Sequence, residues 1–543
     1  MVVKDSGNWY ESHLPPVERK LRGHFSTPPA LVESILDACR FTVEQVTNRF
    51  CSDAPQLNTF RILDPACGGG NFLSAVARRL VSAGKQAHLC EEQIHMLVQK
   101  SIWGFDPDPV ACFLAEMHIR DTLASHKLAL EQFHIHQADG LAFPWQEQQA
   151  CVDLFLANPP YLAAKNNDLS FYRSTEGRGQ VDSYLLFLEL ALHVVRPGGW
   201  MGLVLPDAVL ARVNATHERR RLLDETTIHA LWHLSNVFPA YVGAVVLVAQ
   251  KNPPLHEHNV SWRREKWYKS EKRRLASMKQ PNSVSQTLLR AQPHGEMRYL
   301  LSDESQTLIA RLQTSMHSSY PHIEQMAIKP LDTLVTIKRG EELGKASRFV
   351  SETLSAETYL PLLRGGIDVH AYATPRASNW LPRDVIVKPL ERYRIPKLLV
   401  VKSTPRLQAT LDMQGHVVLQ TLYMLHLRPS IGNGKEVDVL YYLLALLNSH
   451  LLRNYVYMLY TAYKWVQPQI EQHVLECLPI PALDLPQVAE IVQRAKEIMA
   501  ACDREGGVVQ LNNHSKHVFT EQERTIVALY QDALDRFVNK GVD

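Results

Sequence analysis

The sequence predicts an α/β fold, with a doubly wound sheet in its amino-terminal half and a mixed α+β region after it. Between about residues 60 and 250, short apolar runs alternate with stretches of helical periodicity, as strands joined by crossover helices do. Beyond about residue 300, the pattern changes to short apolar runs separated by polar segments, followed by long apolar helices. A chain of 543 residues is also too long for one hydrophobic core, so we expect more than one domain.

Composition limits the partners and the compartment. The formal net charge is only +2, so a polyanion has to be bound by a local basic patch rather than by the field of the whole molecule. Eight cysteines are scattered without a Cys-x-x-Cys pair, and no histidine cluster has metal-ligand spacing, so we expect a reducing compartment and no metal. The amino terminus lacks a signal-peptide core, and no apolar run reaches the roughly 20 residues of a membrane span. These features predict a cytoplasmic protein with no membrane partner.

A helix is expected to begin just after Gly23–Pro29 (GHFSTPP). Ser26 or Thr27 would cap it, and proline suits a first helical turn. By itself this pattern indicates a helix start and says nothing of function.

A glycine-rich turn follows the first expected strand. The strand ends in Asp64, the turn runs over Pro65–Asn71, and Phe72 opens a helical stretch. Glycines let the backbone approach a ligand closely at such a strand end. A triphosphate is disfavoured because no Lys-Ser/Thr pair follows the last glycine. The acidic Asp64 favours a cationic or hydroxyl-bearing ligand instead.

Three further strands are expected to end in polar residues: 101–105 in Asp106, 133–137 near Asp139, and 152–157 in Asn158. An acid after the second strand of such a sheet suits two ribose hydroxyls, and one after the third could accept a hydrogen bond from an adenine amino group. Each acid alone is more often a solvated turn residue or a cap. For this alternative to be correct, the acid at every one of these strand ends would have to be such a turn residue or cap.

The segment Asn158-Pro159-Pro160-Tyr161 suits a flat amine. Two prolines fix φ and remove two donors, so the corner offers acceptors: the Asn158 side-chain oxygen and the Pro159 carbonyl. The Tyr161 ring could stack on the base that carries the amine. For this tetrapeptide alone, a plain turn beside a core aromatic is the alternative.

Five segments in order, GHFSTPP, LDPACGGGNFL, GFDPDP, QADGLAF and DLFLANPPYL, resemble the gamma class of S-adenosylmethionine-dependent DNA adenine-N6 methyltransferases. The resemblance covers about residues 22–250 and implies a seven-stranded, Rossmann-like methyltransferase sheet. One departure is Gly69, where serine is more usual. The later segments resemble the TaqI-type target-recognition region of the same enzymes, in a less specific way.

The resemblance implies roles for individual residues. S-adenosyl-L-methionine would be bound at its methionine end by Phe25, Thr27 and Pro28, and along its amino-acid and sulfonium region by Asp64, Ala66 and Gly68. Asp106 would bind the ribose, and Asp139 and Phe187 the adenine. Asn158, Pro159 and Tyr161 would be catalytic, and Tyr161 and Phe238 would stack on a flipped-out adenine. Transfer from an activated sulfonium needs positioning more than a strong base, so Cys67 and Cys151 are interpreted as buried small residues.

We divide the chain into a catalytic domain (1–255), a basic connector (256–300), a DNA target-recognition domain (301–480) and a C-terminal helical segment (481–543). The connector interleaves basic and aromatic residues as a phosphate-contacting surface would, although a solvated linker explains it at least as well. The polar stretch Asn166–Val181 is either a loop that orders over substrate or a plain connector. Candidate DNA contacts in the recognition domain are Lys338, Arg339, Lys345, Arg364, Lys402, Arg406 and Lys464.

Several element boundaries are also expected. Tyr241–Ala249 reads as the last strand of the sheet, and 437–460 as one long helix. Two amphipathic helices, Pro486–Ala501 and Glu521–Val538, are expected at the carboxy-terminal end. The second should begin at a Thr520-x-x-Glu523 capping box.

These features predict a site-specific adenine methyltransferase acting on double-stranded DNA, in restriction-modification or phage defence. The first motif begins near residue 23, so we expect a modification enzyme without its own nuclease; a separate nuclease or defence proteins remain open as partners. One recognition region favours a monomer. Two alternatives are kept: methylation of RNA or of protein glutamine, and a DNA-specificity subunit without catalysis. Enzymes of the first kind usually lack both the FSTPP segment and the large carboxy-terminal region, and the second is disfavoured because every motif position holds a competent residue.

Overall fold

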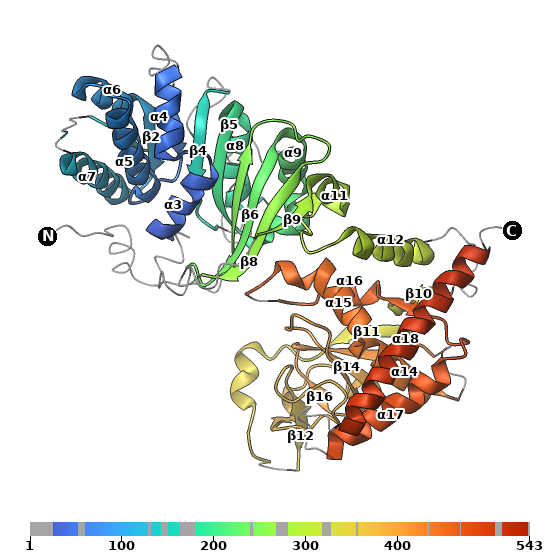
Figure 1. Ribbon diagram of the computed structural model, residues 1–543. Helices are drawn as coiled ribbons and strands as arrows, with labels where there is room; N and C mark the ends of the chain where they lie inside the picture. The colour runs from blue at the N-terminus through green and yellow to red at the C-terminus, as the bar shows by residue number, and fades with distance from the viewer. Residues whose placement is uncertain are drawn as a thin grey trace. The chain divides into compact units, whose positions relative to one another are not determined.

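The computed structural model shows two compact units, Met1–Leu300 (unit 1) and Leu301–Asp543 (unit 2) (Figure 1). The structure describes residues 25–52, 60–126, 128, 132–142, 150–162, 169, 181–238, 243–267, 281–317, 327–354, 357–429, 431, 434–466, 468–504 and 513–540. No helix within these ranges is both long and apolar enough to cross a bilayer.

Unit 1 is built on a nine-stranded sheet with the order β3-β2-β1-β4-β5-β7-β6-β8-β9. Its strands are β1 (Ile62–Asp64), β2 (Ile102–Asp106), β3 (His134–Gln137), β4 (Val152–Ala157), β5 (Val195–Pro206), β6 (Thr227–Ser235), β7 (Ala244–Gln250), β8 (Asn259–Lys266) and β9 (Asn282–Ser285). The five neighbouring strands β3, β2, β1, β4 and β5 run parallel to one another. Strand β7 is antiparallel to both β5 and β6. All six residues of β4 are buried, as expected for a strand covered on both faces.

Helices precede the first strand, connect later strands and follow the last one. They are α3 (Pro29–Ala38), α4 (Val43–Ser52), α5 (Asn71–Gln86), α6 (Glu91–Ser101), α7 (Pro109–Ser125), α8 (Ser183–Val194), α9 (Thr216–Glu225) and α11 (Gln286–Ala291). Helices α3, α4, α6 and α7 all contact α5, while α8 contacts β5 and α9. The predicted doubly wound α/β fold is therefore confirmed.

The sheet continues beyond the seven strands that we expected. Strand β7 is not the last, because β8 pairs in parallel with β6 and β9 pairs with β8. Residues 256–300, expected as a basic connector, thus contribute two strands and α11 to unit 1. One of the basic residues, Arg263, packs on the sheet, since its guanidinium lies 3.9 Å from the centre of the Trp232 ring.

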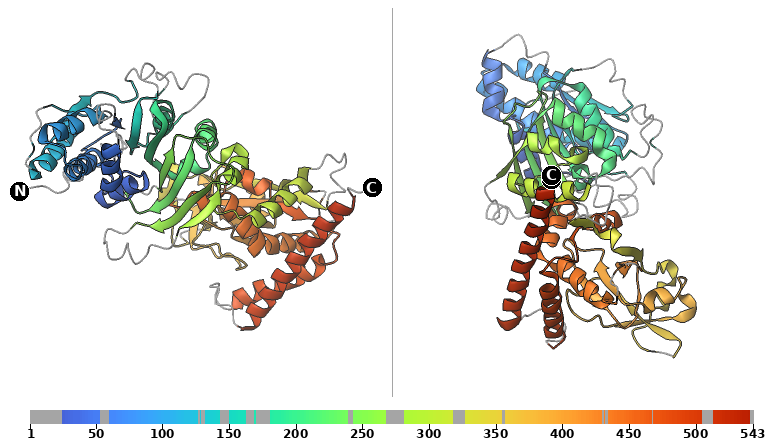
Figure 2. Two further views of the ribbon diagram at one scale, coloured as in Figure 1. Left: turned by 45° about the horizontal axis from the view of Figure 1, so that its top comes forward. Right: turned by 90° about the vertical axis from the view of Figure 1, so that its right-hand side faces the viewer.

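Unit 2 combines three small sheets with long helices. Its strands are β10 (Ile328–Pro330), β11 (Val335–Arg339), β12 (Tyr359–Leu363), β13 (Asn379–Pro382), β14 (Lys397–Val401), β15 (Ala409–Asp412), β16 (Val417–Val418), β17 (Leu422–Leu427) and β18 (Pro479–Pro481). They form the sheets β11-β17-β14-β15, β13-β12-β16 and β10-β18. Its principal helices are α12 (Asp303–His317), α14 (Glu436–Asn448), α15 (His450–Leu459), α17 (Val488–Arg504) and α18 (Asn513–Lys540). Figure 2 shows α17 and α18 side by side, and the mixed α+β prediction holds.

Two helix predictions in unit 2 are wrong in detail. The expected helix 437–460 is broken at Ser449, whose hydroxyl caps α15 by accepting from the Leu452 amide at 3.2 Å. Helix α18 begins at Asn513 rather than Glu521. Thr520 therefore lies inside the helix, where its hydroxyl donates to the Lys516 carbonyl at 2.9 Å instead of capping.

A buried ion pair holds the four-stranded sheet of unit 2. The Lys397 ammonium lies 2.6 Å from Asp412, and both side chains are fully buried. Asp412 also accepts from the His416 ring at 2.9 Å and from the Gly415 amide at 3.2 Å. Burial alone would raise the pKa of Asp412, but the His416 hydrogen bond and the Lys397 charge outweigh it and lower the pKa to about 2.

Replacement of Asp412 by asparagine should destabilise unit 2. We expect the free energy of unfolding to fall by about 3–5 kcal/mol, because Lys397 would be left as a buried charge without its partner. Since the folded pKa lies below the ordinary 3.8, the wild-type contribution is complete above about pH 4 and is lost as the pH falls toward 2. Denaturant unfolding at several pH values measures both effects.

Asp438→Asn is the matched control for this pair. It removes the partner of Lys496 at 2.6 Å, where both side chains are more than 40% exposed, so a loss below about 1 kcal/mol is expected. Equal losses in the two variants would contradict the role assigned to the buried pair.

Candidate active site

The ends of three parallel strands bring polar residues to one edge of the sheet. Strand β1 ends at Asp64, β2 ends at Asp106, and β4 ends just before Asn158. In the sheet, β1 lies between β2 and β4. Because carboxyl ends of parallel strands meet at one edge, the three side chains converge there, as the sequence predicted.

The glycine-rich turn wraps around the end of β2. The Gly68 amide donates to a carboxylate oxygen of Asp106 at 3.0 Å, and the Cys67 amide donates to the Phe105 carbonyl at 2.9 Å. Gly68 and Gly70 both have positive φ, which a residue with a Cβ adopts only at a cost. Gly70 then caps α5, and a Cβ there would lie 2.7 Å from the Ala115 backbone of α7.

The segment before α3 is held over this turn by two asparagines. The Asn71 amide group donates to the Ser26 hydroxyl and to the Thr27 carbonyl, each at 2.9 Å. The Asn158 amide group donates to the Phe25 carbonyl. Residues from three distant parts of the chain are thereby joined.

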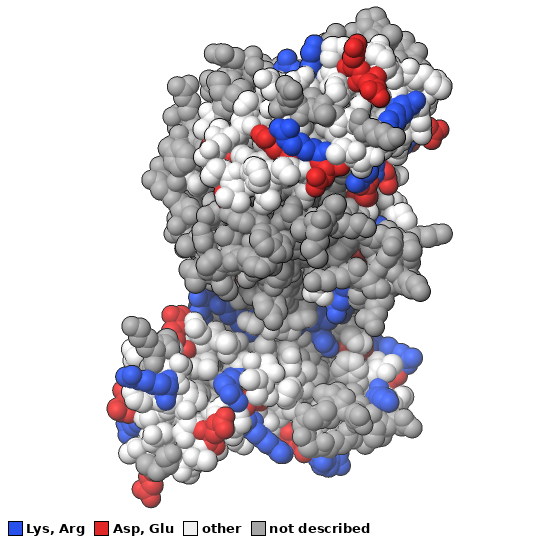
Figure 3. Space-filling model, turned by 90° about the vertical axis from the view of Figure 1, so that its left-hand side faces the viewer, with Lys and Arg blue, Asp and Glu red and all other residues white. Residues whose placement is uncertain are grey.

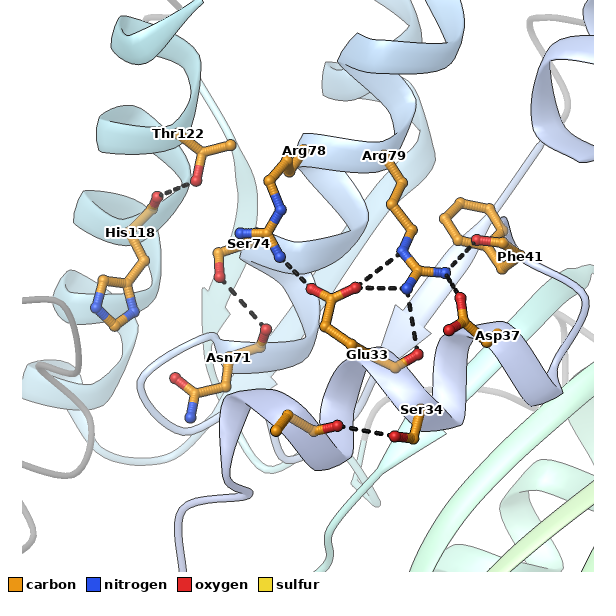
Figure 4. A network of polar contacts seen from close by, with 11 residues as sticks. Glu33, Ser34, Asp37, Phe41, Asn71, Ser74, Arg78, Arg79, His118 and Thr122 are labelled. Atoms are coloured by element: carbon orange, nitrogen blue, oxygen red, sulfur yellow. Dashed lines mark hydrogen bonds and ion pairs between the residues drawn. The ribbon is translucent and has the colours of Figure 1, made fainter. Parts of the chain in front are cut away.

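Ion pairs between α3 and α5 support this arrangement. Figure 4 shows Arg78 and Arg79 of α5 reaching Glu33 of α3, and Arg79 also contacts Asp37 at 2.8 Å. The guanidinium of Arg79 additionally donates to the Phe41 carbonyl at 2.8 Å. The helix that carries the amino-terminal segment is thus fixed to the helix that follows the glycine-rich turn.

These elements line a pocket at the edge of the sheet that opens to solvent. Its lining consists of Phe25, Ser26, Thr27, Asp64, Ala66, Cys67, Gly68, Gly69, Asn71, Phe72, Asp106 and Asn158. Six of the nine residues predicted to bind the cofactor are among them, together with Asn158. The sequence reasoning missed Asn71, although an amide side chain directly after the last glycine was a usable signal.

Three predicted cofactor residues lie outside this lining. Pro28 caps α3, where its carbonyl accepts from the Leu31 amide at 2.8 Å. Phe187 is buried in α8. Asp139 accepts from the Leu141 amide at 2.9 Å, and it precedes Gly140, where a Cβ would lie 2.1 Å from the Pro65 carbonyl oxygen. The turn after β3 therefore packs directly against the glycine-rich turn.

Asp64 gives the pocket its electrostatic character. Burial, the largest effect, raises the pKa of Asp64 to about 8; the Ala66 amide opposes the rise and the nearby Asp106 charge adds to it. The hydrogen bond from the Ala66 amide to the carboxyl is 3.1 Å long, which is weak support for a buried charge. A cation placed beside it would lower this pKa, so the site favours a positively charged ligand.

An aromatic cluster adjoins the Asn-Pro-Pro-Tyr corner. Phe25 stacks on Phe238 with ring centres 5.2 Å apart, and Tyr161 lies 6.2 Å from each of them. The Tyr161 hydroxyl donates to the Val204 carbonyl at 3.3 Å, and burial raises the pKa of Tyr161. Phe25, expected only at the cofactor, thus lies between the pocket and the two residues expected to stack on a base.

Some sequence predictions fall outside the described residues. In the stretch Asn166–Val181 only Leu169 and Val181 are described, and the basic residues Lys269 and Lys272–Arg274 are not. Among the side chains that the structure describes, no group of three or more His, Cys, Asp or Glu residues is arranged to hold a metal ion.

The fold of unit 1, with a pocket at the carboxyl edge of its sheet, is that of the Rossmann-like methyltransferases. The sequence model of the N-6 DNA methylase family matches residues 4–289, more than half of the chain. The chain therefore belongs to the N-6 DNA methylase family, and S-adenosyl-L-methionine is its cofactor. A second match, to the TaqI-like C-terminal specificity domain, covers residues 360–480.

Curated relatives match part of the chain. The methylase subunit of the type I restriction enzyme EcoEI from Escherichia coli is 26% identical over 241 residues, which are 43% of this chain and 44% of the relative. The type II methyltransferase M.PaeR7I from Pseudomonas aeruginosa is 25% identical over 203 residues, 34% of this chain and 32% of the relative. The chain thus spans less than half the length of these relatives.

One solved structure resembles the chain over most of its length. It is the type IIL restriction-modification enzyme MmeI in complex with DNA, with a TM-score of 0.66, 13% identity, and coverage of 97% of this chain and 78% of that one. The DrdV–DNA complex has a TM-score of 0.56 with 12% identity, covering 91% and 59%. At these identities the likeness shows the fold alone.

Gly70→Ala and Gly198→Ala form a matched pair that tests the packing of the turn. Both residues have φ near +80°, so each alanine costs about 1–2 kcal/mol of stability. Only Gly70 adds a clash with α7, worth about 1–3 kcal/mol more, whereas a Cβ at Gly198 would point into open space. Chemical denaturation should show the larger loss for Gly70→Ala, and calorimetry should show weaker cofactor binding for that variant alone. Equal behaviour of the two would argue against the close packing.

Proposed function

We propose that this protein is a site-specific DNA methyltransferase that transfers the methyl group of S-adenosyl-L-methionine to N6 of a flipped-out adenine in double-stranded DNA. One observation carries the proposal: Asn158 of the Asn-Pro-Pro-Tyr corner lines the same pocket as Asp64 and Gly68 of the glycine-rich turn. The amine-binding corner and the cofactor turn therefore face one cavity, as methyl transfer requires.

The pocket residues suit the cofactor. Asp106 already accepts from the Gly68 and Asp108 amides, and its carboxylate at the end of β2 would bind ribose hydroxyls. Asp64 would face the positively charged amino-acid and sulfonium region, alongside the backbone of Ala66 and Gly68. Phe25, Thr27 and Pro28 would border the methionine end, and Asp139 and Phe187 the adenine.

Asn158, Pro159 and Tyr161 would position the target base. The hydrogen bond from the Asn158 amide group to Phe25 fixes that side chain, so its oxygen is left as an acceptor for the substrate amine. The Pro159 carbonyl would accept the second amine hydrogen. Bound S-adenosyl-L-methionine would supply a methyl group already activated by the sulfonium, so the protein contributes orientation, and the proton that the methylated amine loses would pass to solvent.

The aromatic cluster would hold the extruded adenine. A base between two rings needs about 7 Å between their centres, twice the roughly 3.5 Å carbon–carbon contact distance. Phe25 and Phe238 are 5.2 Å apart, so a base could lie between these two rings only if one of them moved. Tyr161 would supply the other stacking surface.

Unit 2 would read the target sequence, since its specificity-domain match spans residues 360–480. Acidic and basic side chains are interspersed on the described surface in Figure 3, so DNA contacts must come from local groups. Several candidates are already engaged: Arg364 with Asp368, Lys464 with Glu471, and Arg406 with Asn454. Lys338 and Arg339 are exposed on β11, but Arg339 lies over the Tyr423 ring at 6.0 Å, so Lys338 is the stronger candidate; the side chain of Lys345 lies outside the described set.

The proposed reaction is tested by tritium transfer. The protein is incubated with labelled S-adenosyl-L-methionine and duplex DNA, RNA or protein, and the labelled product is identified after digestion. We expect N6-methyladenine from duplex DNA, made by a monomer in the cytoplasm, with or without a separate nuclease or defence proteins. Label in RNA or in protein glutamine would establish the first alternative instead, and cofactor-independent DNA binding without transfer would establish a specificity subunit.

Asn158→Ala should abolish transfer while leaving the cofactor bound. Loss of one acceptor for the amine should lower kcat by about 10²-fold or more, as removal of a donor from an oxyanion hole does. The Kd for S-adenosyl-L-methionine should change by less than about tenfold, the worth of one neutral hydrogen bond. Asn252→Ala, which removes an acceptor of the Gly198 amide at 3.1 Å, is the control and should retain both properties. Equal kcat in the two variants would discredit the role of Asn158.

Cofactor binding should strengthen with pH through Asp64. In the free protein the pKa of this carboxyl is about 8, so it is largely protonated at pH 7, whereas a cationic ligand binds its carboxylate. The Kd should therefore fall as the pH rises toward 8 and level off above it, by at most about tenfold per pH unit. Calorimetry from pH 6 to 9 measures this, and Asp64→Asn should flatten the profile. The same slope in wild type and variant would exclude Asp64 as its origin.

A further inference from the structure

Ser183, the first residue of α8, is bound to the chain just after the Asn158-Pro159 pair. Only 3% of its surface is exposed. Its hydroxyl donates to the Pro160 carbonyl and accepts from the Leu162 amide at 3.0 Å. Its own amide donates to the Leu162 carbonyl, also at 3.0 Å.

These hydrogen bonds fix the backbone of Tyr161. The Pro160 carbonyl belongs to the peptide group before Tyr161, and the Leu162 amide to the peptide group after it. Since φ and ψ are the only soft backbone dihedrals, rotation about either would separate one of these groups from the Ser183 hydroxyl. The far end of the Tyr161 ring is held as well, by its hydrogen bond to Val204. The Tyr161 ring is therefore held from its backbone side through the Ser183 hydroxyl and from its far end through Val204.

The same hydroxyl separates the two proline carbonyls by function. Because the Pro160 carbonyl already accepts from Ser183, one of its two lone pairs is occupied, which makes it a poorer acceptor for an amine hydrogen. The Pro159 carbonyl is thereby favoured as the backbone acceptor beside the Asn158 side chain.

The start of α8 is itself anchored. Asp182, 7% exposed, accepts from the Arg212 guanidinium at 3.0 Å and from the Asn214 amide group at 3.4 Å. Both donors lie in the segment between β5 and α9. Ser183 is thus presented from a fixed helix start rather than from an isolated loop.

We propose that Ser183 is a positioning residue that holds Tyr161 and the Pro159 carbonyl in the geometry that receives the target base, an inference that rests on the proposed adenine methylation. It is not among the residues that line the cofactor pocket, so it acts through the backbone of the Asn-Pro-Pro-Tyr corner. Its removal should affect the chemical step and base stacking rather than cofactor binding.

The test compares Ser183→Ala with Ser183→Thr in the full chain. For Ser183→Ala we expect kcat for DNA methylation to fall about 10- to 100-fold, the size of effect that a small misplacement of reacting groups produces. The Kd for S-adenosyl-L-methionine should stay within about twofold of wild type, since no cofactor contact is removed. Fluorescence of 2-aminopurine at the target position should report weaker stacking of the extruded base. Ser183→Thr keeps the hydroxyl and should restore most of kcat.

Thr226→Val is the matched control, because Thr226 is also a buried hydroxyl that donates to a backbone carbonyl, that of Leu222 at 2.6 Å. It should lower Tm to a similar extent and leave kcat unchanged. Should Ser183→Ala fail to fold, Ser183→Cys, a weaker donor of similar size, should show an intermediate kcat. Wild-type kcat in Ser183→Ala or Ser183→Cys, or an equal loss of kcat in Thr226→Val, overturns the positioning role. Failure of the wild-type protein to form N6-methyladenine overturns the proposed function, and this is seen before any variant is compared.

Discussion

The active-site half of the molecule depends on the hydrogen bond from the Gly68 amide to the Asp106 carboxylate. It joins the turn after β1 to the end of β2, and Asp106 holds the following turn as well, through the Asp108 amide at 2.9 Å. Only 1% of Asp106 is exposed, and a buried carboxylate is tolerated only where hydrogen bonds satisfy it. Because backbone amides do so here, the two turns are fixed relative to each other. The floor of the pocket is therefore formed by the backbone of these two turns.

Around this floor, side-chain amides assemble the remaining walls. Asn71 and Asn158 lie on different elements, yet both donate to the segment 25–27 that precedes α3. Because each amide group donates to the protein, the orientation of each side chain is defined. This arrangement couples the cofactor turn to the Asn-Pro-Pro-Tyr corner. In the proposed reaction, methyl transfer from an activated sulfonium would require little beyond such positioning, which accords with a site of acceptors and rings rather than a strong base.

Asp64 differs from Asp106 in how its charge is supported. Its burial raises its pKa to about 8, so ionisation of this carboxyl carries an electrostatic cost that a positively charged ligand can relieve. The aromatic cluster has a similar property, because Phe25 and Phe238 stack where a base would need room. The raised pKa of Asp64 and the stacked rings both fit a site that changes when its ligands bind.

The sequence by itself determined the local parts of this protein. Strand ends, the glycine-rich turn and the proline corner follow from neighbouring residues, because dihedral preferences and hydrophobic periodicity act over a few positions. They were sufficient for the doubly wound sheet, the pocket residues Asp64, Gly68 and Asp106, and the family. Only the tertiary structure decided that β8 and β9 extend the sheet, that Phe25 stacks on Phe238, and that Ser183 holds the corner. These features join residues far apart in the chain, and the partner of a side chain at such distances is set by how whole elements pack, which no local pattern encodes.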